Sequence, residues 1–463
     1  MGDQPIKSML SLTYIWGEFR RSKVGLAGLA ILLILIAISL MAFVSAPLDR
    51  LRDWNDPSAW TFYPRGAMPA WVNIFSTSKL PEHLILDRPE VSVEDSALNI
   101  VVHRYRFNYS YDEFPSDFML NYRVRYEGSA PLLLLSIVRP DNDSIELARV
   151  SLPYASREQV YDATLFSTDR AVQDGVANNI GKYRFPISRD ATVTAVFSSY
   201  EERKVMKGVY TVEVRFFLFN NGEDELIASK FIVGGKVYGI LGTDDLRRDL
   251  SIGLVWGAPI ALFIGISVAS ISVLIGMVYG IISGYKGGST DEVMMRANDV
   301  VYALPALPLL ILLAVSVGRS ILLIVAYLII FGWVGIAKVS RSIALQIKNL
   351  AYVEAAELMG QSSIKIIFRH IFPQLLPYTF ASIAISVPGA IITEAGLSFL
   401  GLGDPTMPTW GQMLHDANLY GAAARGLWWW IVPPGLMIAL TGLAFVLIGN
   451  ALDAIINPRL KRL

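Results

Sequence analysis

Two kinds of hydrophobic pattern divide this chain. Long, nearly unbroken apolar runs lie at residues 24–46, 254–282, 300–317, 321–340, 376–399 and 427–452. A helix of about 20 apolar residues spans the roughly 30 Å hydrocarbon core of a bilayer, so these runs predict six transmembrane helices. Between the first two runs, apolar and polar residues instead alternate with a period of two, which indicates half-buried strands. The pattern predicts membrane helices combined with a β-rich domain.

The β-rich segment is long enough to fold by itself. Residues 120–126 and 210–218 carry apolar side chains, mostly aromatic or β-branched, at every second position. Weaker strand-like runs lie near 98–104, 132–138, 192–198 and 226–233, with turn residues such as Asn220-Asn221-Gly222 between them. About seven short strands favour a β-sandwich, and a segment of this length can bury its own core.

The Lys/Arg distribution predicts which side of the membrane each loop faces. Basic residues gather in the loops of one side and at both ends of the chain: Arg20, Arg21, Lys23, Lys286, Arg296, Lys338, Arg341, Lys348, Lys365, Arg369, Arg459, Lys461 and Arg462. The short loops of the opposite side hold little more than Arg319 and Arg425. Positively charged loops stay in the cytoplasm, so both termini are predicted to be cytoplasmic and the β-rich domain extracytoplasmic.

These predictions divide the chain into segments. We expect a cytoplasmic N-terminus at 1–23, the first transmembrane helix at 24–46, an extracytoplasmic β-rich domain at 47–235, and a helical core at 236–463 that contains a polar cytoplasmic loop at 341–375. A cleaved signal peptide is the alternative for the first run, but the run is long and lacks a small-x-small site before Pro47, which favours an uncleaved anchor. Asn108-Tyr109-Ser110 and Asn142-Asp143-Ser144 fit glycosylation acceptors or ordinary surface turns.

Composition supports a membrane protein and narrows its chemistry. Hydrophobic residues make up 53% of the chain and charged residues only 17%, below the roughly 25% of average proteins. A net charge of zero argues against a nucleic-acid-binding surface. The absence of cysteine excludes disulfides, thiolate metal sites and a cysteine nucleophile. The four histidines lie far apart in sequence, at positions 83, 103, 370 and 415, so no metal site is expected.

The polar loop before the fifth apolar run has a helical pattern of its own. Ala355, Leu358 and Met359 form an apolar stripe on a short helix that Gly360 is expected to end with a left-handed cap. A second helix would begin at Ser362 or Ser363, present Ile364, Ile367, Phe368 and Ile371 on one continuous apolar face, and end at Pro373. Such a hairpin either binds a protein partner in the cytoplasm or lies on the membrane surface.

Residues of this loop resemble the EAA loop of ABC-importer permeases. The matching positions are Glu354, Ala355, Ala356, Gly360, His370 and Pro373. In that family the loop forms a coupling helix that docks into a groove on a cytoplasmic ATPase. The resemblance implies that these residues, together with Ile364, Ile367 and Phe368, couple this chain to an ATPase. The alternative of a membrane-surface hairpin does not explain the matched positions.

Both flanks of the chain, roughly 1–46 and 236–463, resemble the second permease subunit of the dipeptide and oligopeptide transport subfamily. The segments 394–403 and 408–411 match the most specific outer segment of that subfamily. The outer-face signature consists of Gly242, Thr243, Asp244, Arg248 and Asp249, and of Trp410 and Gly411 in the second of these segments. Asp291, Met295, Arg296, Asp299 and Pro305 match the approach to span three, and Pro458-Arg459-Leu460 matches the C-terminus. Arg247, Asn450 and Asn457 depart from the pattern, and Arg247 replaces a glycine, which puts the shape of that turn in doubt.

The resemblance implies a fold and a machine. The fold would be membrane all-α, with six helices of ABC-importer type and a β-sandwich-like domain inserted between helices 1 and 2. The chain would be a transport subunit of the cell membrane and not an enzyme. It would pair with a homologous permease, two cytoplasmic ATPase subunits that bind ATP and Mg, and an external substrate-binding protein for di- or oligopeptides. No cofactor would bind this chain itself.

Several residues are candidates for the pathway. Glu394 is an acid within an apolar run, where burial in lipid is costly, so it is either a gate or pathway residue or a hydrated structural carboxylate. Pro305 and Pro308 are expected to kink span three beside the pathway, or to serve helix packing alone. The same machine could instead import oligosaccharides, nickel chelates or glutathione. A membrane-anchored receptor is a further alternative, although an anchor needs one span and not six.

Overall fold

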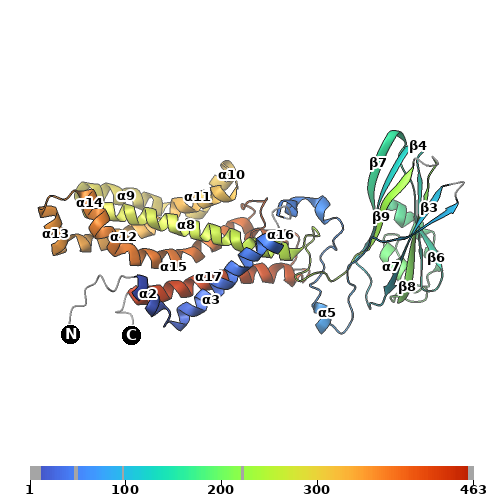
Figure 1. Cartoon of the computed structure of the whole chain (residues 1–463), viewed down its shortest axis with the longest axis horizontal. Coiled ribbons are helices and arrows are strands. Elements are labelled where there is room, and N and C mark those ends of the chain that lie inside the picture. Colours follow the sequence, from blue (N-terminus) through green and yellow to red (C-terminus); the bar gives the residue numbers. More distant parts are fainter. Residues whose placement is uncertain (1–11, 46–50, 96–98, 220–223, 457–463) are drawn as a thin grey trace. The chain divides into compact units, whose positions relative to one another are not determined.

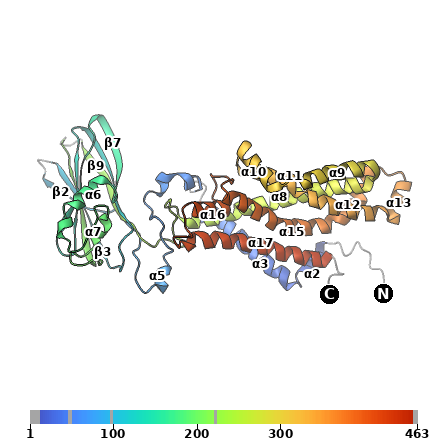
Figure 2. The same ribbon diagram turned by 180° about the vertical axis from the view of Figure 1, so that it is seen from behind.

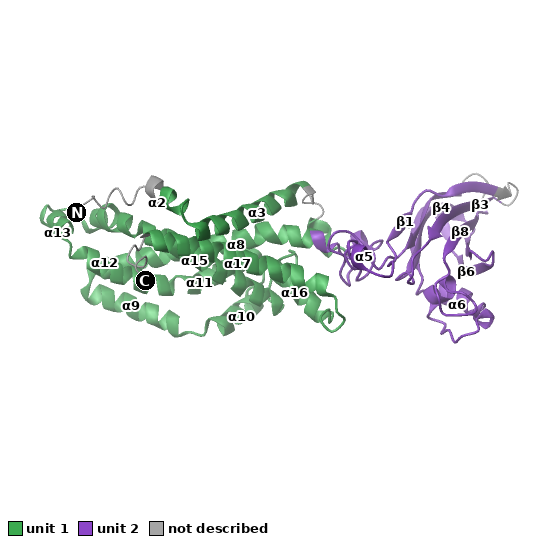
Figure 3. Ribbon diagram, turned by 90° about the horizontal axis from the view of Figure 1, so that it is seen from below, with its two compact units in different colours: residues 1–56, 252–463 green, residues 57–251 purple. Residues whose placement is uncertain are grey.

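The computed structural model describes residues 12–45, 51–95, 99–219 and 224–456, which form two compact units (Figure 3). The helical unit combines residues 1–56 with 252–463, and the β unit comprises residues 57–251. The predicted turn at Asn220-Asn221-Gly222, the C-terminal motif from Asn457 to Leu460 and the terminal basic residues lie outside the described residues.

The helical unit is built from long apolar helices (Figure 1). In the described part of the chain, α3 (Lys23–Ser45), α8 (Leu250–Lys286), the helix Ser363–Phe399 and α17 (Trp428–Ile456) are long and apolar enough to cross a membrane alone. Two further pairs are bent: α9 (Gly288–Ala303) with α10 (Ala306–Ser316) by 78°, and α11 (Ile321–Gly332) with α12 (Val334–Lys348) by 41°. Counting each bent pair as one span gives six, so the prediction of six spans stays a prediction.

Shorter helices complete this unit. They are α2 (Leu12–Phe19), the 3-10 turn η1 (Asp53–Asn55), α13 (Ala351–Leu358), α14 (Ser363–Ile366), the π-helical turn η4 (Ile367–Ile371), α15 (Phe372–Phe399) and α16 (Trp410–Leu419). Figure 2 shows α13 and α16 near opposite ends of the helical unit. The polar loop, which contains α13, and the segment that carries Trp410 therefore lie far apart along the helices.

The third predicted span is interrupted at a proline. Leu304, just before Pro305, has an extended backbone (ψ 135°), and the chain turns by 78° between α9 and α10. The residue before a proline disfavours the helical conformation, so the predicted kink at Pro305 is confirmed. Pro308 lies in the first turn of α10, where its missing N–H would have no helical partner, and the expectation that it kinks the helix is wrong.

Close packing between α8 and α12 depends on glycine. A β-carbon placed on Gly280 would lie 2.3 Å from the carbonyl oxygen of Ala337 and 2.7 Å from the amide nitrogen of Arg341. Gly276 and Gly284, one turn before and one turn after, also face the backbone of α12. Small residues four positions apart let two helix backbones approach closely within a membrane. Such close packing matters there because lipid is as apolar as leucine, so no hydrophobic effect drives the helices together.

The β unit is a two-sheet sandwich. In the described residues, one antiparallel sheet has the order β1 (Leu84–Leu86), β9 (Glu225–Val233), β4 (Phe118–Gly128) and β7 (Ala155–Phe166). The other has the order β2 (Glu90–Asp95), β3 (Ile100–Tyr109), β8 (Gly208–Phe217), β5 (Leu132–Val138) and β6 (Ser144–Ser151). Tyr122 of β4 packs on Phe216 of β8 with ring centroids 5.4 Å apart, so the sheets share one core. The predicted β-rich region is confirmed.

The short helices of this unit are η2 (Pro57–Trp60), α5 (Val72–Phe75), α6 (Arg170–Ala177), η3 (Ile180–Lys182) and α7 (Thr192–Phe197), of which α6 and α7 contribute buried side chains to the sandwich core. The strand predicted near 192–198 is wrong, because this segment forms α7. Thr192, Ala195, Val196 and Phe197 are buried there at helical spacing. Their packing against the core outweighs the strand preference of β-branched residues.

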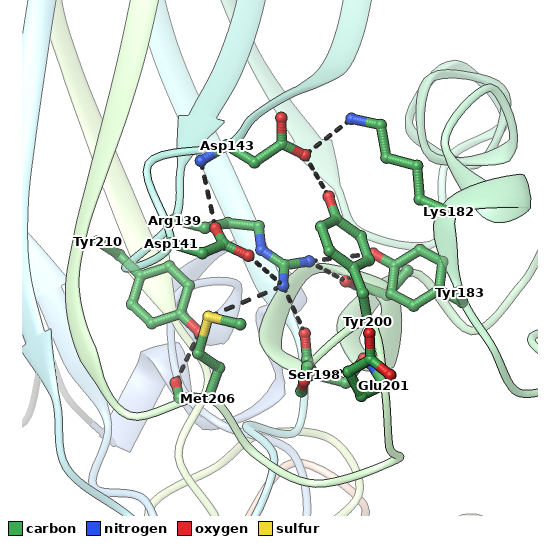
Figure 4. A network of polar contacts seen from close by, with 12 residues as sticks. Arg139, Asp141, Asp143, Lys182, Tyr183, Ser198, Tyr200, Glu201, Met206 and Tyr210 are labelled. Atoms are coloured by element: carbon green, nitrogen blue, oxygen red, sulfur yellow. Dashed lines mark hydrogen bonds and ion pairs between the residues drawn. The ribbon is translucent and has the colours of Figure 1, made fainter.

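A buried arginine joins loops of the β unit (Figure 4). The side chain of Arg139, which has no exposed surface, donates to the carbonyl oxygen of Ser198 at 2.7 Å and to the carboxylate of Asp141 at 3.1 Å. It also donates to the hydroxyl of Tyr183, and its guanidinium lies 4.1 Å from the ring centroid of Tyr200. A charge is tolerated inside this unit because many groups surround it.

Candidate functional site

The polar loop folds as two helices joined by a capped turn. Gly360 has a φ of 75°, and its N–H bonds to the carbonyl of Glu357 while the N–H of Gln361 bonds to that of Ala356. This pair of bonds is the Schellman motif, so the predicted left-handed cap at Gly360 is confirmed. Ser362 stands at the N-cap of α14, as one of the two predicted positions, without a side-chain capping bond.

Pro373 does not end the second helix, contrary to the prediction. The helix runs without a break from Ser363 to Phe399, and Pro373 lies in the first turn of α15. The π-helical turn Ile367–Ile371 directly precedes it. A widened turn changes the hydrogen-bonding pattern where proline lacks an N–H, so the helix continues.

The π-helical turn also divides the predicted continuous apolar face. Ile367 and Ile371 are buried in a core that includes Met277 and Ile281 of α8, whereas Ile364 and Phe368 are exposed. The five-residue turn rotates the later positions relative to a regular α-helix. Ile367 is therefore part of the framework of the loop and not of its surface.

The EAA residues divide in the same way. Ala356 is buried in the core beneath the loop, while Glu354 and Ala355 are exposed. At the end of α13, Leu358 is 89% exposed and Met359 is also exposed. The loop thus presents apolar side chains from α13 and α14 on a buried apolar framework.

Hydrogen bonds fix this framework. The hydroxyl of Tyr285, near the end of α8, donates to the carboxylate of Glu357 on α13 at 2.8 Å. His370 Nε2 lies 3.2 Å from the side-chain oxygen of Gln361, which links the π-helical turn to the cap. His370 was predicted as a coupling residue, and its position indicates that it holds the turn in shape.

Asp291 and Asp299, quoted from the approach to span three, hold α9 against α12. Arg341 forms a two-nitrogen ion pair with Asp291, with Nε 2.6 Å from Oδ1. Lys338 pairs with Asp299 at 2.7 Å. Both basic residues lie one turn apart on α12, so the loop is attached to α9 as well as to α8.

A cavity of about 370 Å³ lies between α8, α10, α11 and α15. Small and weakly polar residues line much of it: Ala269, Ser272, Ala306, Gly332, Ser386, Gly389 and Thr393. The hydroxyl of Ser272 is buried and has no hydrogen-bond partner among the described residues. A buried polar group without a partner is costly, so this wall is suited to a polar guest or water. The sequence reasoning missed the cavity; the run of small residues spaced three and four apart on α15 was the available signal.

The predicted pathway residues do not line this cavity. Glu394 is 3% exposed and accepts a hydrogen bond from Ser398 at 2.6 Å, one turn along α15. Its neighbours are packed closely, since a β-carbon on Gly411 would lie 2.7 Å from Ser398. This environment fits the structural carboxylate more closely than the gate. Pro305 and Pro308 flank the cavity-lining residue Ala306 without lining the cavity themselves.

The outer-face signature is distributed over both units. Asp244 and Arg248 form a buried ion pair at 2.6 Å, and the hydroxyl of Thr243 donates to the carbonyl of Pro64 at 2.7 Å. These residues belong to the β unit, although the predicted domain ended at 235. In the helical unit, the indole N–H of Trp410 donates to the carbonyl of Leu254 at 2.9 Å.

Arg247 keeps the backbone shape expected for the glycine it replaces. Its φ is 66°, in the left-handed region. The side chain donates to the carbonyl of Tyr63 and to the carboxylate of Asp117, both at 2.6 Å. The arginine at this position therefore joins the turn before α8 to two other segments of the β unit.

No part of the chain that the structure describes gathers three His, Asp or Glu side chains in a way that could hold a metal ion. The candidate site is therefore the polar loop together with the cavity.

Comparisons with known proteins agree with this geometry. The family model "binding-protein-dependent transport system inner membrane component" matches residues 276–462. A dipeptide transport system permease protein of Bacillus subtilis is 40% identical over 222 residues, which cover 48% of this chain and 69% of the relative. An oligopeptide transport system permease protein of the same organism is 38% identical, covering 48% and 72%.

A third relative differs in the substrate that its name gives. The glutathione transport system permease protein of Pectobacterium atrosepticum is 36% identical over 222 residues, which cover 48% of this chain and 73% of the relative. The β unit at 57–251 lies outside the matched family model. From the loop, the apolar helices and these relatives together, the chain belongs to the binding-protein-dependent ABC importer permeases, within their peptide-transport subfamily.

Proposed function

We propose that this chain forms half of the translocation pathway of an ATP-driven importer for di- and oligopeptides. The polar loop would dock on a cytoplasmic ATPase subunit and transmit its motion to the spans. The observation that carries this proposal is the exposed apolar surface of the loop: Leu358, Met359, Ile364 and Phe368. A groove on a protein partner would bury these side chains without moving the framework beneath them.

The contacts of the loop with neighbouring helices support a role in transmitting motion to the spans. Val353, Ala356 and Ile371 share a buried core with the end of α8. A force on the exposed side chains would therefore reach α8, and through the Arg341–Asp291 pair it would also reach α9. Switching between two packed states through such contacts is how a ligand bound elsewhere moves domains.

The cavity beside α15 supports a pathway role for that helix. Gly389 and Gly396 face open space, so this side of α15 is free to meet a homologous permease within the described structure. We propose that the partner permease completes the pathway there. Two ATPase subunits would bind ATP and Mg, an extracytoplasmic binding protein would deliver the substrate, and both termini would lie in the cytoplasm. The chain itself would need no cofactor.

Glutathione is the second candidate substrate. The 36% identical relative is named for glutathione transport, and glutathione is itself a tripeptide. Uptake of labelled peptides of two to five residues and of glutathione, with the purified binding protein of the system, would distinguish these cargoes.

Substitutions in the loop test the coupling role. In proteoliposomes containing the whole importer, we expect Leu358→Asp, Glu354→Lys and Gly360→Pro each to lower peptide uptake per ATP hydrolysed by about tenfold or more. The aspartate places a charge in an apolar contact, and proline cannot adopt the φ of 75° at Gly360.

Leu358→Met is the matched control, because it keeps an apolar side chain of similar volume and should leave uptake unchanged. Membrane insertion of every variant is checked by its yield after purification with the partner subunits or, if docking fails, alone. Normal uptake in the inserted Leu358→Asp variant would refute the docking role.

A further inference from the structure

The β unit carries an exposed apolar cluster that its own core does not use. Trp71 lies at the start of the short helix α5, Ile74 and Phe75 lie on that helix, and Ile240 lies on a segment that is hydrogen-bonded to Trp71. Ile74 is 77% exposed, Phe75 79% and Ile240 73%. These four residues are named the apolar cluster. Most large apolar side chains of this unit are buried between its sheets, so the cluster requires a separate explanation.

Hydrogen bonds hold the cluster in its exposed arrangement. The indole N–H of Trp71 donates to the carbonyl of Ile240 at 2.9 Å, which joins the two segments. The side chain of Asn73 both donates to and accepts from the backbone of Leu80, each at 3.0 Å. The loop is therefore braced on both sides, and its apolar side chains are presented outward by a fixed backbone.

The cluster is close to the start of a membrane-spanning helix. Ile240 precedes Gly242 by two residues, and the carbonyl of Gly242 accepts a hydrogen bond at 3.1 Å from the N–H of Leu250, the first residue of α8. Thr243 and Asp249 pair as an antiparallel bridge within the same turn. Two residues span at most about 7 Å, so the backbone of Ile240 lies within roughly 10 Å of the start of α8.

This distance matches the edge of a bilayer. The headgroup region adds about 5–8 Å to each side of the hydrocarbon core, and α8 is long and apolar enough to cross that core. Tryptophan is enriched at this depth because its ring is apolar and its N–H is polar. The N–H of Trp71 already has a carbonyl partner, so the ring could enter an apolar layer without an unpaired donor.

We propose that the apolar cluster inserts into the headgroup region of the bilayer and anchors the β unit to the membrane surface. A protein partner is the competing occupant. Stable protein interfaces use about 20–30 residues on each side, whereas a lipid surface can bind a few large apolar side chains. The small size of the cluster and its position beside the start of α8 both favour lipid.

The absence of cysteine from the chain makes a direct test available. Ile74→Cys, Phe75→Cys and, as the matched control, Tyr154→Cys are labelled with an environment-sensitive fluorophore in the full chain, reconstituted alone in nanodiscs. Tyr154 is 73% exposed in the same unit and precedes β7. The discs contain phosphatidylcholine and phosphatidylglycerol, with or without a lipid that carries a nitroxide near its headgroup.

We expect the labels at positions 74 and 75 to emit at shorter wavelength than the label at 154. The nitroxide lipid should quench them at least twofold, and iodide in the water should quench them at least threefold less than the control. Quenching by iodide equal to that at 154 would overturn the proposal. Protection from iodide without quenching by the nitroxide lipid would also overturn it, because protein and not lipid would then cover the cluster.

Discussion

The two units of this chain place the same kinds of residue in opposite positions. In the helical unit, Leu40 and Val44 of α3 are exposed, while glycines of α8 lie against the α12 backbone. In the β unit, Val124 and Phe216 have no exposed surface, and the charged side chain of Arg139 has none either. The difference shows which solvent each unit is built for.

The same comparison explains what holds each unit together. Water drives apolar side chains of the β unit into one core, and that gain can offset the cost of a well-bonded charge. Lipid provides no such drive between helices, so the helical unit depends on close contact at small residues. Substitutions of the buried charge and of the contact glycines should therefore affect the two units separately.

Removing the buried charge should have the largest effect. Arg139→Met deletes the donors to Ser198 and Tyr183, and it leaves the carbonyl of Ser198 without its partner. We expect the free energy of opening of the β unit to fall by about 3 kcal/mol. Hydrogen exchange of β5 and α7 in the full chain, followed by mass spectrometry, measures this loss.

An exposed ion pair of the same unit provides the control. Arg123 and Asp162 pair at 2.7 Å with both side chains about half exposed. Arg123→Met should change the free energy of opening by no more than about 1 kcal/mol. If both variants lowered the free energy of opening by the same amount, burial would not distinguish the two arginines. The explanation given for the stability of the β unit would then be wrong.

A glycine substitution tests the helical unit. Gly280→Val places a side chain where the α12 backbone lies only 2.3 Å from the β-carbon, so the two helices must separate. We expect the free energy of unfolding of the helical unit to fall by about 1–3 kcal/mol, and this fall should appear as a lower aggregation temperature in detergent. Exchange in β4 and β8 should stay unchanged.

Gly435→Val is the matched control, since a β-carbon at Gly435 meets nothing within 4 Å. It should leave the aggregation temperature within the error of the wild type or raise it slightly, because valine restricts the unfolded chain. A fall equal to that of Gly280→Val would mean that close helix contact is not what stabilises this unit.

Much of the fold could be predicted from hydrophobic periodicity, and the failures have physical causes. Alternation located β4 and β8, because each strand has one buried face. The segment 192–198 was assigned to a strand from its β-branched residues, yet core packing makes it α7. The bend at Pro305 followed from local stereochemistry.

The site could be predicted in part. The cap at Gly360 depends only on the residues around it, so the sequence was sufficient. The burial of Ile367 depends on a π-helical turn and on contacts with α8 almost 90 residues earlier, which a local pattern does not contain. The cavity around Ser272 combines four helices, so no single segment indicated it.

The smallest effect should be a pH dependence confined to the β unit. His103 of β3 is buried, its Nδ1 lies 2.7 Å from the hydroxyl of Ser229 on β9, and burial lowers the pKa of His103 below 6.5. The unfolded chain then binds a proton first as the pH falls, so stability is present above pH 6.5 and is lost below it, by at most about 1.4 kcal/mol per pH unit. Hydrogen exchange of β3 at pH 7.5 and 5.5, corrected for intrinsic rates, should show this loss in the wild type and a smaller one in His103→Gln.

Burial also lowers the pKa of His83, which would account for the loss of stability that remains in His103→Gln. An equal loss in both proteins would assign the pH dependence to groups other than His103, while the helical unit should show none of it in either case.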